Sequence, residues 1–407
     1  MRLLIISIRF SPEIMSNANV ITGLARALAG IGHEVTVVAG TPHDGLRHIE
    51  WGYVLRPFRW EKDAGVRIVR CWAFPKSNGK AAKFLNYITF TFTAFLAALF
   101  LGRPDAVVTV SPPLWLALVA MFLRTLHHCP VIYNAQDLFP EAYLASGEFH
   151  SGWLANLLSK LMVRIYRRSD RITVVTKSFV KTIAAKGIDA AKIIYIPNYV
   201  NSPMVTPRPR RNSFSRARGF DDNFVVMHAG NIGYTHEVEL LVEASEKLAP
   251  LKDVRILIVG DGSKRAGLIR LAEKRDTQNL LFLDPQPDEL LPELLATADV
   301  FVHASKRGAG VASFPGRIYN YLRAGRPIVA SVDSEFDLAH LLRETGAGVV
   351  TEPGNAESLC QAIQTLYHDA SARERMARNG RAYMERDYSP HAVIESYDSL
   401  LKQLIDS

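Results

Sequence analysis

The chain of 407 residues is 48% hydrophobic and 22% charged, the composition of a soluble globular protein, and its length predicts two domains. Its three cysteines, at positions 71, 129 and 360, have neither CxxC nor metal-ligand spacing. A disulfide framework and a zinc site are therefore not expected. The same cysteine pattern predicts a reducing compartment.

The net charge of +8 is divided unevenly along the chain. Residues 1–200 carry 23 Lys and Arg against 12 Asp and Glu, whereas residues 223–407 carry 20 against 26. A basic first half predicts an anionic partner for that half. Nucleic acid is not expected, because no RNP, zinc-finger or helix-turn-helix pattern accompanies the charge. An anionic membrane surface or a substrate with a pyrophosphate group fits better.

Strand and helix patterns alternate from the start of the chain. A helix is predicted at residues 18–28, and apolar runs predict strands at residues 2–8, 35–39, 66–71, 106–110, 131–134, 172–175 and 193–196. This alternation is typical of a parallel, doubly wound sheet. Glu13 lies in the first strand-to-helix loop, at the carboxyl end of its strand, where ligand crevices form in such folds.

Residues 84–102 carry no charge, and their length is just sufficient to span a bilayer. A small and polar stripe nevertheless recurs at helical spacing through Asn86, Thr89, Thr93 and Ala97. Because the flanking segments belong to one sheet, a helix that is buried or dips into a membrane surface is favoured over a transmembrane span. Basic residues precede the segment and would favour anionic headgroups, at Lys76, Lys80 and Lys83. A core helix preceded by solvated lysines is the alternative.

The segment 134–141, Asn-Ala-Gln-Asp-Leu-Phe-Pro-Glu, follows a predicted strand and contains two carboxylates four residues apart. A carboxylate at the carboxyl end of a strand can orient or deprotonate a substrate hydroxyl. It can equally cap the following helix, which is the favoured role for Glu141.

Residues 201–222 contain three prolines and five arginines without an apolar period, and we interpret them as a linker. The strand and helix alternation then restarts at residue 224. We therefore predict an N-terminal domain at 1–200, the linker at 201–222, and a C-terminal domain at 223–385. The last segment, 386–407, is expected to be a helix that packs back on the N-terminal domain.

The second half opens with a short predicted strand followed by a turn between Gly230 and Gly233 and then a helical pattern. Glycines let the backbone approach a ligand closely, and the start of a helix leaves unpaired N–H groups. Such a turn can hold a phosphate, although the same arrangement is common in packing.

Six segments together carry a resemblance to a known family. They are Phe-Ser-Pro-Glu at 10–13, Gly-His-Glu-Val-Thr-Val at 32–37, Asp-Leu-Phe-Pro-Glu at 137–141, Gly-Asn-Ile-Gly at 230–233, Val-Gly-Asp-Gly at 259–262 and Gly-Arg-Pro at 325–327. In this order and spacing the chain resembles bacterial retaining glycosyltransferases of family 4, of the kind that build O-antigen, capsule and colanic-acid-type polysaccharides. The resemblance covers nearly the whole chain. It implies the GT-B fold, two Rossmann-like α/β domains with doubly wound parallel sheets.

The resemblance implies transfer of a hexose or N-acetylated aminosugar from a nucleotide-sugar, a UDP-sugar first of all, held mainly by the C-terminal domain. Backbone amides and cations can stabilise the departing diphosphate, so neither a metal nor a further cofactor is expected. The expected donor-binding residues are Gly230, Asn231, Gly233, His236, Lys264, Ser313, Pro315, Gly316, Arg317 and Asn320.

The sequence departs from the family pattern before Gly325. Many members carry a Glu-x7-Glu motif there, whereas this chain has Ala312 and Asn320 at the aligned positions. The loop instead resembles a Ser-x-Pro-Ser-Lys-like subgroup, with Gly316 in place of serine and Arg317 in place of lysine. Asn320 could bond a ribose hydroxyl without the charge-assisted strength of a carboxylate.

In the first half, the resemblance places Asp137 beside the reacting sugar, as an orienting or acid/base group. Glu13, Ser16 and Asn17 are the expected acceptor contacts, although the paired glycines of many relatives are missing from that loop. The expected acceptor is an undecaprenyl-diphosphate-linked saccharide, and the expected location is the cytoplasmic face of the membrane, peripherally bound. Two alternatives are a sugar-nucleotide epimerase of the same architecture and a non-catalytic adaptor in a polysaccharide assembly complex.

Overall fold

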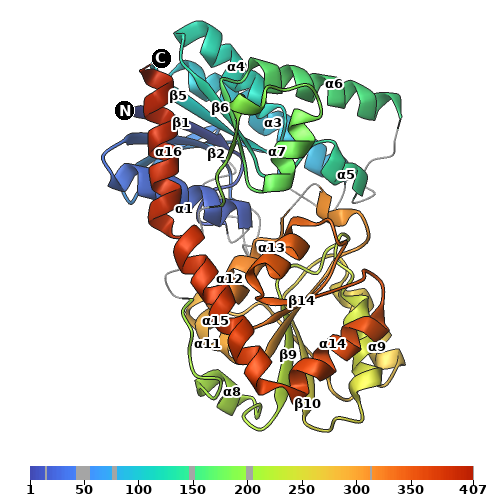
Figure 1. Cartoon of the computed structure of the whole chain (residues 1–407). Helices are drawn as coiled ribbons and strands as arrows, with labels where there is room; N and C mark the ends of the chain where they lie inside the picture. Colours follow the sequence, from blue (N-terminus) through green and yellow to red (C-terminus); the bar gives the residue numbers. More distant parts are fainter. Residues whose placement is uncertain are drawn as a thin grey trace. The chain divides into compact units, whose positions relative to one another are not determined.

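The computed structural model describes residues 1–13, 16–42, 56–75, 80–145, 152–198, 205–311 and 314–406. The chain forms two compact units (Figure 1). Unit 1 comprises Met1–Glu141, Phe149–Asn201 and Pro390–Ser407, and unit 2 comprises Ala142–Glu148 and Ser202–Ser389.

Unit 1 is built on an eight-stranded sheet of order β3-β4-β2-β1-β5-β6-β7-β8. Only β3, which pairs with β4, runs antiparallel among these strands. The strands are β1 (Arg2–Ser7), β2 (Glu34–Gly40), β3 (Phe58–Asp63), β4 (Val66–Cys71), β5 (Ala106–Ser111), β6 (Val131–Ala135), β7 (Arg171–Val174) and β8 (Ile193–Tyr195). The helices are α1 (Ser16–Gly30), α3 (Lys80–Leu99), α4 (Leu116–His127), α6 (Trp153–Arg168), α7 (Lys177–Ala184) and α16 (Pro390–Ile405). The short helix α5 (Glu141–Ala145) begins at the last residue of the first segment of unit 1 and continues in unit 2.

The central strands of unit 1 are buried on both faces, as strands of a parallel sheet between helices must be. In β1, Leu3 and Ile5 face a core formed with α1 and α16, whereas Leu4 and Ile6 face a second core formed with α3 and α4. Successive side chains of a strand point to opposite faces, so one continuous apolar run supplies both cores.

The C-terminal helix α16 is part of unit 1 and lies beside α1 (Figure 1). Its apolar face packs into the first core through Val393, Tyr397, Leu400, Leu401 and Leu404. Polar contacts fix the same helix, because the Tyr397 hydroxyl accepts a hydrogen bond from Asn134 at 2.7 Å and Asp398 lies 3.0 Å from His33. A segment nearly 200 residues away in sequence thereby completes the first unit.

Helix α3 covers part of the sheet in unit 1, and its polar stripe faces inward. Asn86 Nδ2 donates to the carbonyl of Phe74 at 2.7 Å, and Thr93 Oγ1 donates to that of Trp72 at 2.7 Å. Residues 81–99 are long and apolar enough to cross a membrane by length and composition, and a third of that stretch is buried in the structure. These hydrogen bonds attach one side of the helix to its own domain.

Unit 2 is built on a six-stranded parallel sheet of order β11-β10-β9-β12-β13-β14. The strands are β9 (Phe224–Ala229), β10 (Val254–Val259), β11 (Leu280–Leu283), β12 (Val300–Ala304), β13 (Ile328–Ser331) and β14 (Gly348–Thr351). The helices are α8 (Ser213–Ala217), α9 (Glu239–Leu248), α10 (Arg265–Lys274), α11 (Leu291–Ala296), α12 (Arg317–Arg323), α13 (Asp337–Thr345), α14 (Ala356–His368) and α15 (Ala370–Asp387).

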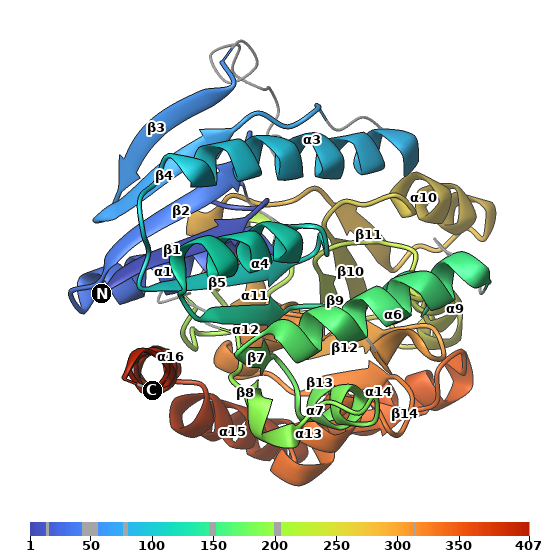
Figure 2. The same ribbon diagram turned by 90° about the horizontal axis from the view of Figure 1, so that it is seen from above.

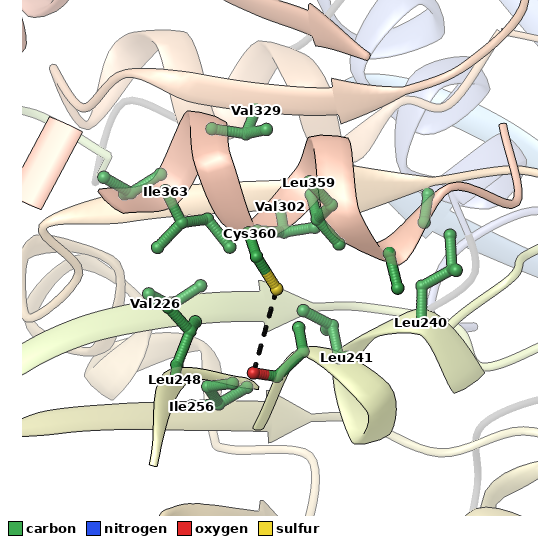
Figure 3. Packing of buried hydrophobic residues seen from close by; sticks show 14 of the residues in the cluster. Val226, Leu240, Leu241, Leu248, Ile256, Val302, Val329, Leu359, Cys360 and Ile363 are labelled. Carbon is green, nitrogen blue, oxygen red and sulfur yellow. Dashed lines mark hydrogen bonds between the residues drawn. The ribbon is translucent and has the colours of Figure 1, made fainter. Parts of the chain in front are cut away.

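The core of unit 2 shows why its helices lie where they do. Leu359 and Ile363 of α14 pack against Val226 of β9 and Val302 of β12, and α9 lies alongside (Figure 3). Cys360 is buried within this cluster, with its Sγ 3.9 Å from the carbonyl oxygen of Ala244. All three cysteines are free and buried.

Part of the segment predicted as a linker has regular structure within unit 2. Asn212 caps α8 through a capping box with Ser215, and Arg210 forms an ion pair with Asp299 at 2.9 Å. The same Asp299 carboxylate accepts a hydrogen bond from the N–H of Val225 at 2.7 Å. Residues 205–222 are therefore attached to the start of β9.

Candidate functional site

Two glycine turns meet at the carboxyl edge of the sheet in unit 2. Gly230 follows β9 and Gly260 follows β10, and their φ angles are +141° and +136°. A Cβ on Gly260 would lie 2.1 Å from the carbonyl oxygen of Gly230, and one on Gly262 would lie 2.4 Å from that of Ile232. The glycines are thus required because two backbones touch and because side chains disfavour these φ angles.

The paired turns use part of their hydrogen-bonding capacity on each other. The N–H of Gly230 donates to Val259 at 2.8 Å, and the N–H of Ile232 donates to Asp261 at 2.9 Å. Within the described chain, no backbone hydrogen bond uses the N–H groups of Asn231 and Gly233. Those two amides are therefore the share of the turn that is available to an anionic ligand.

Replacing Gly260 with alanine is expected to lower the free energy of unfolding of unit 2 by about 2–4 kcal/mol, because the new Cβ forces the paired turns apart. Urea denaturation measures the effect. Gly267 of α10 is the matched control, since a Cβ there meets nothing within 4 Å. Gly267→Ala should be neutral or stabilising by up to about 1 kcal/mol, as expected within a helix. Equal denaturation midpoints for the two variants would contradict the proposed backbone contact.

Arg317, the first residue of α12, is the centre of the candidate site. Its guanidinium donates to Nε2 of His228 at 2.6 Å, to Nε2 of His236 at 2.9 Å and to the carbonyl of Asn231 at 2.9 Å. A Cβ on Gly230 would lie 2.9 Å from its Cζ atom. The first glycine of the turn therefore also makes room for the arginine.

The histidines that hold Arg317 are neutral acceptors. Burial, followed by the charge of Arg317, lowers the pKa of His228 well below its ordinary value and the pKa of His236 to about 3. His228 Nδ1 lies 3.2 Å from the carbonyl of Val302, which fixes the tautomer with a proton on Nδ1. Its Nε2 is then free to accept from the guanidinium.

A third histidine, His303 of β12, completes the cluster. Its ring lies 5.5 Å from that of His236, and burial also lowers its pKa well below the ordinary value. The described ranges contain no group of three or more His, Cys, Asp or Glu side chains placed to hold a metal ion. The Nε2 atoms of two of these histidines already accept hydrogen bonds from Arg317.

Lys264, Arg265 and Arg317 are three cations near this edge, and they differ in their partners. Lys264 forms an ion pair with Glu239 and donates to the carbonyl of His236 at 3.1 Å. Arg265 forms an ion pair with Asp284 at 2.7 Å. Among the ion pairs of the described residues, none contains Arg317. The positive charge of Arg317 is therefore held by neutral groups, whereas carboxylates compensate the other two.

Tyr321, one helical turn after Arg317, joins α12 to the end of β9. Its hydroxyl donates to the carbonyl of Ala229 at 2.8 Å and accepts from the N–H of the same residue at 2.9 Å. Its ring stacks on Phe301 at 3.8 Å. These contacts fix the start of α12, and so the guanidinium, relative to the turn.

The remaining donor-site predictions lie around the same helix. Asn320 is partly buried, and its Oδ1 has no hydrogen-bond partner within the described part of the chain. Gly316 is the N-cap of α12, and the carbonyl of Pro315 accepts from Ile318 at 3.0 Å. Ser313 lies outside the described residues.

At the carboxyl edge of the unit 1 sheet, Asp137 follows β6 by two residues. Burial raises the pKa of its carboxyl to about 6, and Lys83 acts in the opposite direction. Next to it, Gln136 Nε2 donates to Asn134 Oδ1 at 2.7 Å, and Asn134 in turn contacts Tyr397 of α16. The C-terminal helix thus supports the strand end that positions Asp137.

The other predicted residues of unit 1 lie in two places, the first strand-to-helix loop with the start of α1, and the start of α5. Glu13 is 3% exposed and forms an ion pair with Arg9 at 3.0 Å. Ser16 begins α1, and Asn17 follows it, partly buried. Glu141 begins α5 and forms an ion pair with Lys186. Their roles toward a substrate stay predictions.

Sequence reasoning did not identify His228, His303 or Tyr321. Two of them carry a recognisable signal, because His228 and His303 are polar residues near the carboxyl ends of otherwise apolar buried strands. In an α/β sheet that position faces the ligand crevice. Tyr321 carries no such signal, since an aromatic residue at helical spacing from Ile318 is ordinary core.

Two Rossmann-like units, with an isolated cation and glycine turns at the carboxyl edge of the second sheet, are the architecture of GT-B enzymes. Comparison of the sequence with known protein families agrees with this architecture. Residues 18–199 match the family of the glycosyl transferase 4-like domain, and residues 210–383 match the family of glycosyl transferases group 1. The chain is a glycosyltransferase with the GT-B fold, and the predicted fold class is confirmed.

Individual relatives are similar over most of their length. WcaI of Escherichia coli K12, whose name assigns it to glycosyl transfer in colanic acid biosynthesis, is 26% identical over 98% of each chain. WbjE of Pseudomonas aeruginosa, named as a glycosyltransferase, is 23% identical over 82% of this chain and 84% of its own. The structure of Anabaena Alr3699/HepE in complex with UDP and glucose superposes with a TM-score of 0.73 at 17% identity, covering 99% of this chain and 100% of that one.

Proposed function

We propose that this glycosyltransferase transfers a hexose or an N-acetylated aminosugar from a nucleotide-sugar, with retention of configuration, to an undecaprenyl-diphosphate-linked saccharide in bacterial surface polysaccharide synthesis. One observation carries the donor part of the proposal. Among the described residues, only neutral groups hold the positively charged Arg317, and it lies beside two amides that no backbone hydrogen bond uses. A diphosphate supplies the missing anion.

Asp137 is the group that we assign to the reacting centre in unit 1. A carboxyl whose pKa is raised to about 6 can exchange a proton near neutral pH, which an ordinary aspartate does poorly. Its place after β6 is the carboxyl edge where parallel sheets bind ligands. The acceptor hydroxyl is the group that we expect it to orient or deprotonate.

The substrate classes rest on relatives and on charge. The structure of Alr3699/HepE contains UDP and glucose, which supports a UDP-sugar as the first donor to test. The name of WcaI supports polysaccharide synthesis. The basic first half supports an acceptor with a diphosphate and an enzyme bound peripherally to the cytoplasmic face of the membrane.

A binding screen with UDP-, GDP- and dTDP-sugars tests the proposal. We expect one nucleotide-sugar to bind the purified protein and raise its unfolding temperature, and we expect its free nucleoside diphosphate to compete. The Arg317→Ala variant should lose this stabilisation. Absence of stabilisation by every nucleotide-sugar would overturn the donor assignment, and turnover of the free donor to its epimer would identify an epimerase.

A further inference from the structure

Helices α3, α4 and α6 lie side by side over one face of the unit 1 sheet, and their outward sides form one surface (Figure 2). Ring contact joins the first two, because Phe95 of α3 and Phe122 of α4 have centroids 4.9 Å apart. We call the outward sides of these three helices the outer helical face.

The outer helical face exposes large apolar side chains at helical spacing on all three helices. Phe92 is 62% exposed and Trp153 is 77% exposed. The others are Phe84, Leu85, Ile88 and Leu99 on α3, Leu118, Phe122 and Leu126 on α4, and Leu154 and Leu157 on α6. A surface helix of a globular protein normally carries polar residues on its outward side. Apolar exposure on three neighbouring helices indicates a surface that something else covers.

The charged residues of these three helices have one sign. None of the 48 residues of α3, α4 and α6 is Asp or Glu, although the whole chain has 40 acidic residues in 407. An average share would have placed nearly five there. The basic residues of these helices are Lys80, Lys83, Arg124, Lys160, Arg164, Arg167 and Arg168, and Arg124 pairs with Asp170 at 2.9 Å. A protein partner could have either sign of charge, whereas a bilayer with anionic lipids matches this combination of apolar and basic residues.

The attachment of α3 determines how such a surface would meet a bilayer. Its polar stripe is hydrogen-bonded to the chain before the helix, where Thr89 Oγ1 also accepts from the N–H of Phe74 at 2.8 Å. Phe90 and Ala94 are buried in the second core. A helix fixed on this side can lie in the plane of the interface, with its exposed apolar side toward the acyl chains.

We infer that the outer helical face is a docking surface for a lipid bilayer that contains anionic phospholipid. Exposed aromatic and aliphatic side chains enter the boundary between headgroups and acyl chains, and the basic residues of α6 contact phosphate groups. The inference gives the proposed membrane location a definite surface. It rests on unit 1 alone, so donor binding by unit 2 is an independent readout that separates its failure from failure of the proposed function.

Flotation with vesicles of phosphatidylcholine and phosphatidylglycerol tests the inference on the full chain. The wild type should float with these vesicles, float less as salt rises, and bind pure phosphatidylcholine weakly. Charge reversal of Lys160 and Arg164 together should weaken binding by about thirtyfold or more. The matched control reverses Arg270 and Lys274 of α10, an exposed basic pair at the same helical spacing, and should bind as the wild type does.

Apolar insertion is tested separately with Trp153→Ser on α6, which should reduce binding even at high salt. Trp60→Ser is its control, because Trp60 is 63% exposed on β3, between Arg59 and Glu61, and lies on none of the three helices. Each variant should retain the unfolding temperature and nucleotide-sugar binding of the wild type.

Equal loss of vesicle binding in variants and controls, or no binding to anionic vesicles, overturns the inference. Release from the membrane by detergent alone would show an integral span. If Trp153→Ser converted a dimer to a monomer and left vesicle binding intact, the outer helical face would be assigned to a second copy of the chain.

Discussion

Replacing Arg317 with alanine is expected to weaken nucleotide-sugar binding by about 10- to 150-fold, which corresponds to about 1.5–3 kcal/mol for a charge-assisted contact. The guanidinium is held by His228, His236 and the carbonyl of Asn231, so its charge is directed by groups that do not neutralise it. Isothermal titration with the donor found in the screen measures the loss. The free nucleoside diphosphate should lose a similar factor, because the contact is to phosphate.

Arg265→Ala is the matched control for this experiment. Arg265 lies at the same edge of the sheet, but the largely exposed carboxylate of Asp284 compensates its charge at 2.7 Å. Such pairs contribute little, so donor affinity should change less than threefold. Arg317→Lys should recover only part of the affinity, since an ammonium group cannot reproduce the planar, forked contact with two histidines. Equal effects of Arg317→Ala and Arg265→Ala would remove Arg317 from the donor site.

Replacing Asp137 with asparagine is expected to change activity and stability in opposite directions. Turnover should fall by about 10²-fold or more, because a proton-exchanging group is lost. The variant should nevertheless unfold at a higher temperature than the wild type at pH 8. Buried ionised carboxylates are costly, and burial raises the pKa of Asp137 to about 6.

The pH dependence of this stability difference has a definite sign. Between the ordinary pKa of 3.8 and the folded value of about 6, the folded chain binds more protons at Asp137 than the unfolded chain does. The contribution of this group to stability therefore falls as pH rises through that window. Asp137→Asn should remove a cost of roughly 1–3 kcal/mol above pH 6 and almost none below pH 4. Thermal unfolding across this pH range measures the difference.

Asp105 supplies a control of opposite sign in the same unit. The N–H and guanidinium of Arg2 lower the pKa of its carboxyl. Its stabilising contribution is present above pH 3.8 and is lost as pH falls below it. Asp105→Asn should therefore lower the unfolding temperature at neutral pH, where Asp137→Asn raises it. If both variants were less stable than the wild type at pH 8, the raised pKa of the Asp137 carboxyl would be contradicted.

The sequence predicts strands well where they are buried on both faces. The predicted strand at 66–71 coincides with β4, and that at 106–110 lies within β5. It does not predict β3 or β14. β3 is an edge strand with four charged residues among its six, Phe-Arg-Trp-Glu-Lys-Asp, and β14 is an edge strand whose first three residues are only partly buried. Such edge strands lack the fully buried apolar run that reveals a central strand.

The sequence alone determined the class of fold and the order of its parts, because apolar periodicity and glycine turns are local features that one segment contains in full. It also identified Gly230, Gly233 and Arg317 as candidates. Only the tertiary structure decided which cation has no carboxylate partner among the described residues. The partners of Arg317 are 81 to 89 residues away in sequence, on β9 and in the turn before α9, and the carboxylate that compensates Lys264 begins α9. Charge compensation depends on distance in space, which no local pattern contains.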